Sequence, residues 1–164
     1  MKFISAFRWL ALLGFIALLA GCATLLPGPT VGLSVVNLRP LESTILETSV
    51  AVTLRLTNES AQPFVLAGSN HKLFLNGTSV GHAVSSERLT VPAFGTVTPT
   101  VTVYLENLTL LRKASEFSQA PKLAYRLESR LHPTEAAGFG DVKATATGEL
   151  DLVALGLAAP APVR

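Results

Sequence analysis

The sequence predicts an all-β fold, an immunoglobulin/fibronectin-III-like antiparallel β-sandwich of about seven strands with one short helix. Three observations carry this prediction. Apolar and polar residues alternate with a period of two in several segments, and an Asn-Gly pair stands between two apolar runs. The chain is also poor in charge, with 15% Asp, Glu, Lys and Arg, and rich in the β-branched and aliphatic residues that sheets favour.

Four segments show the alternation clearly: residues 50–57, 100–106, 123–131 and 142–152. In the first of them, Val and Leu occupy the even positions, while Ala, Thr and Arg occupy the odd ones. This pattern predicts strands with one buried and one solvated face. Arg55 is expected on the polar face. A further strand is expected from Val31 onward.

Two local signals place a hairpin and a helix. Asn76-Gly77 supplies the positive φ values of a type I′ turn and so predicts a β-hairpin. Residues 108–119 predict the helix, with Asn107 or Thr109 as the cap and Pro121 at its end. Its expected apolar face consists of Leu110, Leu111, Ala114 and Phe117. Between these elements, Pro92 and Gly95 predict a break, and residues 132–140 a loop.

The N-terminus has the layout of a secretory signal. Lys2 and Arg8 precede an uncharged stretch that ends in Leu19-Ala20-Gly21-Cys22, and Cys22 is the only cysteine in the chain. This run resembles the lipobox of bacterial lipoproteins. The resemblance implies cleavage between Gly21 and Cys22 and attachment of diacylglycerol and an acyl chain such as palmitate to Cys22. The alternative is an uncleaved transmembrane anchor.

The lipobox divides the chain into a signal peptide (1–21), an acylated tether (22–30), a β-sandwich domain (31–153) and a tail (154–164). Ala23 after the cysteine favours the outer membrane, with the domain facing the periplasm. Loss of Lys2 and Arg8 leaves eleven basic and eleven acidic residues, and this balance argues against nucleic acid as a partner. The membrane, through acylated Cys22, is the expected partner.

Residues 29–152 resemble the late embryogenesis abundant type 2 group, also called the water stress and hypersensitive response domain. The matching features occur in a fixed order: Asn58 after a strand, Pro63-Phe64, the hairpin at 73–77, Gly81, the turn at 92–95, the strand at 97–105, the helix at 108–119, Tyr125 and Gly148. The family's Asn-Pro-Asn is replaced here by Asn58-Glu59-Ser60. The resemblance implies a β-sandwich and a non-enzymatic protein of the stress response.

Signals for catalysis or metal binding are weak. Gly77-Thr78-Ser79-Val80-Gly81 fits the G-x-S-x-G pattern of hydrolases, but it follows a hairpin turn and continues as a strand, so we expect no enzyme. His71 and His82 could face each other across the hairpin, yet two ligands are too few for a closed zinc site. We expect all three histidines, including His132, on the surface or in loops, and no cofactor or metal.

Three asparagines begin N-x-S/T triplets: Asn58, Asn76 and Asn107. In a bacterial lipoprotein, turn and cap roles explain them better than glycosylation. The expected function is a lipid-anchored envelope protein that protects or binds under water stress. The alternative is an envelope assembly or carrier lipoprotein that holds a partner protein or an apolar ligand. A cavity of several hundred Å³ between the sheets would favour the carrier.

Overall fold

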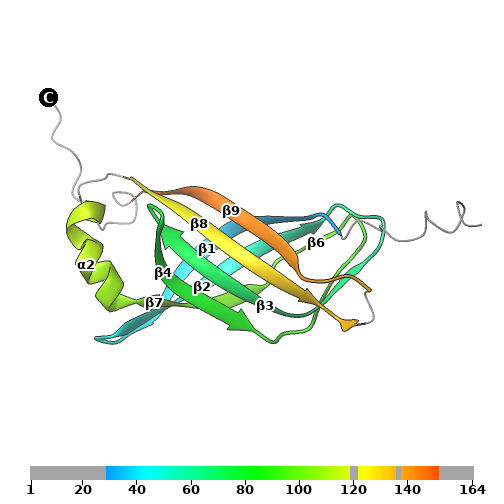
Figure 1. Cartoon of the computed structure of the whole chain (residues 1–164), viewed down its shortest axis with the longest axis horizontal. Helices are drawn as coiled ribbons and strands as arrows, with labels where there is room; N and C mark the ends of the chain where they lie inside the picture. The colour runs from blue at the N-terminus through cyan, green and yellow to red at the C-terminus, as the bar shows by residue number, and fades with distance from the viewer. Residues whose placement is uncertain (1–28, 119–121, 136–137, 152–164) are drawn as a thin grey trace, which may run out of the picture.

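The computed structural model describes residues 29–118, 122–135 and 138–151. In this part of the chain, nine strands and one helix follow each other (Figure 1). Their bounds are β1 (Val31–Ser43), β2 (Glu47–Asn58), β3 (Phe64–Leu75), β4 (Thr78–Ser85), β5 (Leu89–Val91), β6 (Thr96–Val97), β7 (Thr100–Glu106), α2 (Asn107–Ser118), β8 (Lys122–Pro133) and β9 (Val142–Asp151).

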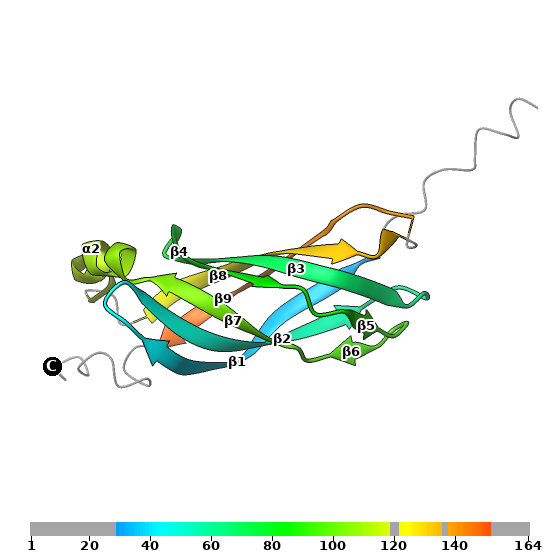
Figure 2. The same ribbon diagram turned by 90° about the horizontal axis from the view of Figure 1, so that it is seen from below.

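The strands form one antiparallel sheet in the order β1-β2-β7-β4-β3-β8-β9, with β5 added to β3 and β6 added to β2. The sheet curls around its buried face, so that the two end strands of this order, β1 and β9, lie close together (Figures 1 and 2). The structure therefore confirms a mostly β fold with one helix. It does not confirm the expected sandwich of two separate sheets.

The junction between β4 and β7 joins the two halves of the sheet. Only two residue pairs make it, Gly81 with Leu105 and His82 with Tyr104. Gly81 permits this close approach, because a Cβ at that position would lie 2.7 Å from the backbone oxygen of Tyr104. Alternation within single strands carries no information about this pairing, so a curled sheet and a sandwich look alike in sequence.

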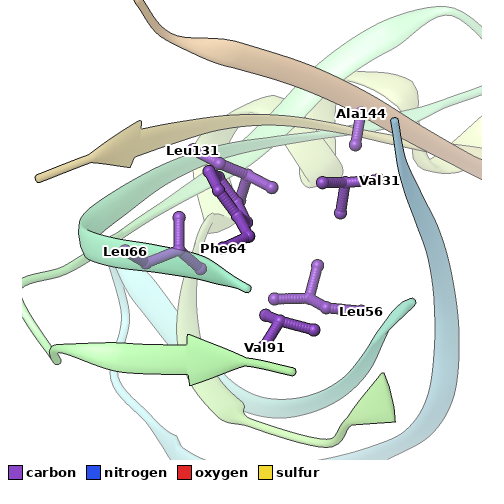
Figure 3. Packing of buried hydrophobic residues seen from close by; sticks show 7 residues of the cluster. All are labelled: Val31, Leu56, Phe64, Leu66, Val91, Leu131 and Ala144. Carbon is purple, nitrogen blue, oxygen red and sulfur yellow. The ribbon is translucent and has the colours of Figure 1, made fainter. Parts of the chain in front are cut away.

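Among the described residues, the buried side chains form three clusters along the inside of the curled sheet. The cluster farthest from the helix contains Val31, Leu56, Phe64, Leu66, Val91, Leu131 and Ala144 (Figure 3). The middle cluster is built mainly from β2 and β7, with one buried residue each from β4, β8 and β9. The third lies beneath α2, where Phe117 packs against Leu75, Val80 and Leu123. The even positions of residues 50–57 contribute to the first two clusters, as predicted.

The hairpin prediction is confirmed. Asn76 and Gly77 both have positive φ, 46° and 81°, and they connect β3 with β4. The side chain of Asn76 also accepts a hydrogen bond from the backbone of Ala124 at 3.0 Å, and this bond ties the turn to β8. The expected loop at 132–140 starts later than predicted, because β8 continues to Pro133.

The helix is present, but its expected apolar face is partly wrong. Only Leu110 and Phe117 pack on the core, whereas Ala114 is exposed and Leu111 is 73% exposed. The helix covers one end of the sheet with a narrow face, so part of the expected apolar face points to solvent. The side chain of Asn107 donates through Nδ2 to the backbone oxygen of Thr44 at 2.7 Å, which ties the start of α2 to the turn between β1 and β2. The hydroxyl of Thr109 donates to the carboxylate of Glu106 at 3.0 Å.

Candidate functional site

Asn58 is a fully buried polar side chain at the end of β2. Its Nδ2 donates to the backbone oxygens of Gln62 at 2.7 Å and Pro92 at 3.1 Å, with a longer contact to Val91. Its Oδ1 accepts from the backbone N–H of Ser60 at 3.0 Å. One amide thus holds together the turn after β2 and the turn at 92–95, and the turn role predicted for Asn58 is confirmed.

A second constrained position lies where β8 pairs with β9. Tyr125 stands opposite Gly148, and a Cβ at Gly148 would lie 2.6 Å from the Tyr125 ring. Any larger residue at position 148 would therefore displace the ring. Tyr125 in turn packs against the cluster beneath α2. The pair fixes the ring over the backbone of β9 and closes the core at the helix end of the molecule.

His71 is buried, with 2% of its surface exposed. Its Nδ1 lies 2.6 Å from Ser129 Oγ on β8, and its Nε2 lies 2.9 Å from Ser69 Oγ. Burial lowers the pKa of His71 to about 4, so the ring is neutral at pH 7. The expectation of a surface histidine is wrong here. The position of His71 two residues before Leu73 and four before Leu75 could have shown that it shares their buried face.

The family model of the late embryogenesis abundant proteins (LEA_2) matches residues 53–148. The chain belongs to this family. The match includes Asn58, the hairpin, the helix, Tyr125 and Gly148, which carried the resemblance in the sequence. No curated protein matches the chain.

The solved structures that resemble this LEA_2 domain include two whose similarity covers most of both chains. A protein from Archaeoglobus fulgidus is 16% identical, and the similarity covers 72% of this chain and 97% of that one, with a TM-score of 0.50. A protein from Arabidopsis thaliana, whose structure was determined in solution, is 15% identical over 79% of this chain and 85% of that one, with a TM-score of 0.57. At these identities, the likeness shows a shared fold.

The departure from the family's Asn-Pro-Asn has a structural explanation in this LEA_2 domain. The retained Asn58 alone makes the side-chain hydrogen bonds that close the turn. The backbone of Glu59 donates to the oxygen of Thr30, just before β1. The backbone oxygen of Ser60 accepts from Phe94, which has a φ of 51°. Glu59 therefore supplies a backbone N–H that a proline at this position would lack, and the departure from the family pattern adds a hydrogen bond between the turn and the start of β1. The backbone oxygen of Ser60, by contrast, is a group that any residue type supplies.

The predicted lipidation site lies outside the described residues. Gly21 and Cys22 belong to the segment before residue 29, as does the predicted signal peptide, and the tail from 154 follows residue 151. β1 begins at Val31, at the end of the molecule opposite to α2 (Figure 1). Among the residues that the structure describes, no helix is long and apolar enough to cross a membrane.

The structure separates the residues considered for catalysis or zinc. Ser79 is exposed on β4, opposite Phe74, and does not occupy a strand-to-helix turn. His82 stands opposite Lys72 on the outer face of the sheet, while His71 points into the core. The two histidines therefore do not face each other across the hairpin, as the sequence had suggested they could. His132 contacts Asp141 at 2.8 Å. Within the described ranges, no three His, Cys, Asp or Glu side chains gather as metal ligands.

The hollows of the domain differ between its inside and its outside. Two hollows lined largely by core residues hold about 20 Å³ each, roughly the space of one water molecule. On the outer surface of the described residues lie wider hollows, among them two of about 480 Å³ each. One of them is lined by Leu41, Glu42, Ser49, Thr102 and Tyr104, and the other by residues of β3, β8 and β9.

Exposed apolar side chains gather at the end that carries α2. We call them the helix-end surface: Ile45 at 95% exposure, Leu46 at 74%, Leu108 at 53% and Leu111 at 73%. The turn between β1 and β2 reaches the start of α2, where the backbone of Asn107 donates to the oxygen of Leu46 at 3.0 Å (Figure 2). Sequence reasoning missed this surface because its two halves are about sixty residues apart.

Proposed function

We propose that this LEA_2 protein is a lipid-anchored envelope protein with a non-catalytic, protective role under water stress. Membership of the LEA_2 family suggests a water-stress-related protein, and this match is the observation that carries the proposal. The small interior hollows support a packed domain in preference to a carrier with an internal ligand.

The surface contains hydroxyl pairs that suit a protein exposed to drying. Thr53 Oγ1 lies 3.1 Å from Thr100 Oγ1, and Thr57 Oγ1 lies 3.1 Å from Thr96 Oγ1. Each pair joins neighbouring strands through one hydrogen bond that needs no water, while the second hydroxyl of the pair keeps a free donor. Because a polar group that loses its partner is costly, such pairs keep part of the surface satisfied when water leaves. The domain would therefore remain folded in the dry state and could shield neighbouring membrane or protein surfaces.

The proposed anchor is Cys22. A single acyl chain binds membranes only marginally, at about 0.8 kcal/mol per buried CH₂, so the two or three chains of a lipoprotein would give a lasting attachment. With β1 starting soon after Cys22, the end of the domain opposite to α2 would lie nearest to the lipid. The helix-end surface would then face away from the membrane.

Intact-mass analysis of the membrane-extracted protein tests the anchor directly. We expect a chain that begins at Cys22 and carries the mass of added acyl chains. The Cys22→Ala variant should lose both the acyl mass and the membrane association. An unmodified chain that keeps residues 1–21 in the membrane fraction would contradict lipidation and favour an N-terminal helix as the anchor.

Survival after drying tests the stress role. A deletion strain should survive drying and osmotic shock less well than the parent, and the intact gene should restore survival. Complementation with Cys22→Ala then separates the two parts of the proposal, since a soluble domain that restores survival would make the anchor unnecessary. Equal survival of the deletion strain and its parent under both stresses would contradict the protective role.

The helix-end surface favours a second candidate function, docking of another envelope protein. Contiguous exposed apolar side chains commonly mark interaction sites. The double variant Ile45→Ser/Leu111→Ser should then lose a partner that is cross-linked to the native protein in cells. Val84→Ser is the matched control, because Val84 is equally exposed at 73% but lies on β4. Identical cross-links in all three proteins would argue against docking at this surface.

A further inference from the structure

The outer face of β3, β8 and β9 contains a hollow of about 480 Å³. Two neighbouring rows of cross-strand partners line it. One row joins Lys72, Glu128 and Thr145, and the next joins Asn70, Arg130 and Lys143. The residues between these rows, His71, Ser129 and Ala144, point into the core. Ser129 and Ala144 also contribute to the lining, while the exposed residues of the two rows place the hollow on the outer sheet surface.

The acidic side chains near this hollow already have basic partners. Glu128 stands directly opposite Lys72, but its ion pair is with Arg126. Arg126 is held in place over the ring of Phe74, with its guanidinium carbon 4.2 Å from the ring centre. Lys72 is consequently left without an ionic partner among the described residues.

Lys143 also lacks an ionic partner among the described residues, and its cross-strand neighbour carries the same charge. It stands directly opposite Arg130, and like charges at such positions destabilise a sheet. Arg130 makes only a long contact of 3.9 Å with Asp141, and Asp141 is also held by His132. Lys143 makes no ion pair in the described part of the chain. The fold gains nothing from this arrangement, whereas a bound anion would offset the repulsion.

The spacing of the cations suits one shared oxyanion. Strands lie about 4.8 Å apart and alternate residues about 6.8 Å apart, so the Cα atoms of Lys72 and Lys143 are separated by roughly 12 Å. Two extended lysine side chains span that distance, and Arg130 lies between them on β8. Asn70 and Thr145 add neutral hydrogen-bonding groups at the rim.

We propose that this hollow is a binding site for a phosphate-type oxyanion, held by Lys72, Arg130 and Lys143. Glu128, neutralised by Arg126, would form its floor. Hydroxyl groups attached to the anion could bond Asn70 and Thr145. The phosphate could belong to a free phosphorylated molecule or to a phospholipid headgroup, since both present the same group. This site depends neither on the lipid anchor nor on the stress role.

Phosphate titration of the full chain tests the site. The ¹⁵N-labelled protein is held in non-ionic detergent micelles, and inorganic phosphate replaces chloride at constant ionic strength. We expect saturable shifts confined to the amides of residues 70–72, 128–130 and 143–145. Lys72→Gln and Lys143→Gln should each weaken phosphate binding about tenfold, the usual effect of losing one charged hydrogen bond.

Lys122→Gln is the matched control, because Lys122 lies on the same outer face but is paired with Glu149 at 3.3 Å. It should leave phosphate affinity within about twofold of the native value. Unchanged amide positions elsewhere in each variant show that the fold is retained. Absence of saturable shifts, or an equal loss of affinity in Lys122→Gln, would overturn the proposal.

Micelles doped with phosphatidylglycerol or phosphatidylcholine, without free phosphate, then identify the source of the anion. The same shifts with phosphatidylglycerol, and their loss in Lys143→Gln, would assign the site to a lipid headgroup. Shifts with inorganic phosphate alone would assign it to a free phosphorylated molecule.

Discussion

Replacing Asn58 with Ala should be among the most destabilising single changes in this domain. The side chain is fully buried, and the change would leave the oxygen of Gln62 and the N–H of Ser60 without their partners at 2.7 and 3.0 Å. An unsatisfied buried group costs about 1–3 kcal/mol. The two backbone groups that lose their partners are only partly buried, so water can reach them in part. We therefore expect the free energy of unfolding to fall by about 2–4 kcal/mol. This is a large share of the 5–15 kcal/mol of stability typical of a domain.

Urea unfolding followed by circular dichroism measures this loss, with an unchanged m-value as the sign that the native state is otherwise intact. Asn58→Asp keeps the shape but replaces the donor group that faces three carbonyl oxygens, so it should destabilise at least as much at pH 7. Asn70→Ala is the control, since Asn70 is exposed and surface changes usually stay within about 0.5 kcal/mol. A loss below about 1 kcal/mol for Asn58→Ala would refute the role given to this amide.

Three further changes have defined outcomes. Gly81→Ala places a Cβ against the backbone of β7 and should cost more than about 2 kcal/mol in urea unfolding, whereas Gly140→Ala has open space and should be nearly neutral. The pKa of His71 is lowered to about 4, so the unfolded chain binds more protons between pH 6.5 and 4. The contribution of His71 to stability is therefore fully present above pH 6.5 and falls by up to about 3 kcal/mol toward pH 4. His71→Gln should remove this part of the pH profile in thermal unfolding. Phe117→Ala should cost about 3–5 kcal/mol in urea unfolding, against nearly nothing for exposed Leu111→Ala.

Local features of the fold follow directly from the sequence. The strand at 50–57, the hairpin at Asn76-Gly77 and the helix after β7 all depend on residues close together in the chain. Turn geometry and the alternation of side chains between two faces depend on residues about two to four positions apart, so both can be predicted from a single sequence. The exposure of Leu111 was not predictable in this way, because it depends on how far α2 overhangs the end of the sheet.

The candidate sites also divide into those set by neighbouring residues and those set by contacts between distant strands. The predicted lipobox around Cys22 and the turn role of Asn58 both rest on neighbouring residues. The partners of Asn58 beyond Gln62, the burial of His71 against Ser129, and the unpaired charges of Lys72 and Lys143 are not. Each of these requires strands that are far apart in sequence to lie side by side.

The sequence by itself determined the secondary structure, the family and the predicted processing site, because propensity, turn chemistry and motif order are local properties. Only the tertiary structure decided that the strands curl into one sheet. The short junction at Gly81 permits that closure, because the absence of a Cβ allows β4 to reach the backbone of β7. The same closure decides which side chains share a face, and so which of them have partners and which remain free to bind.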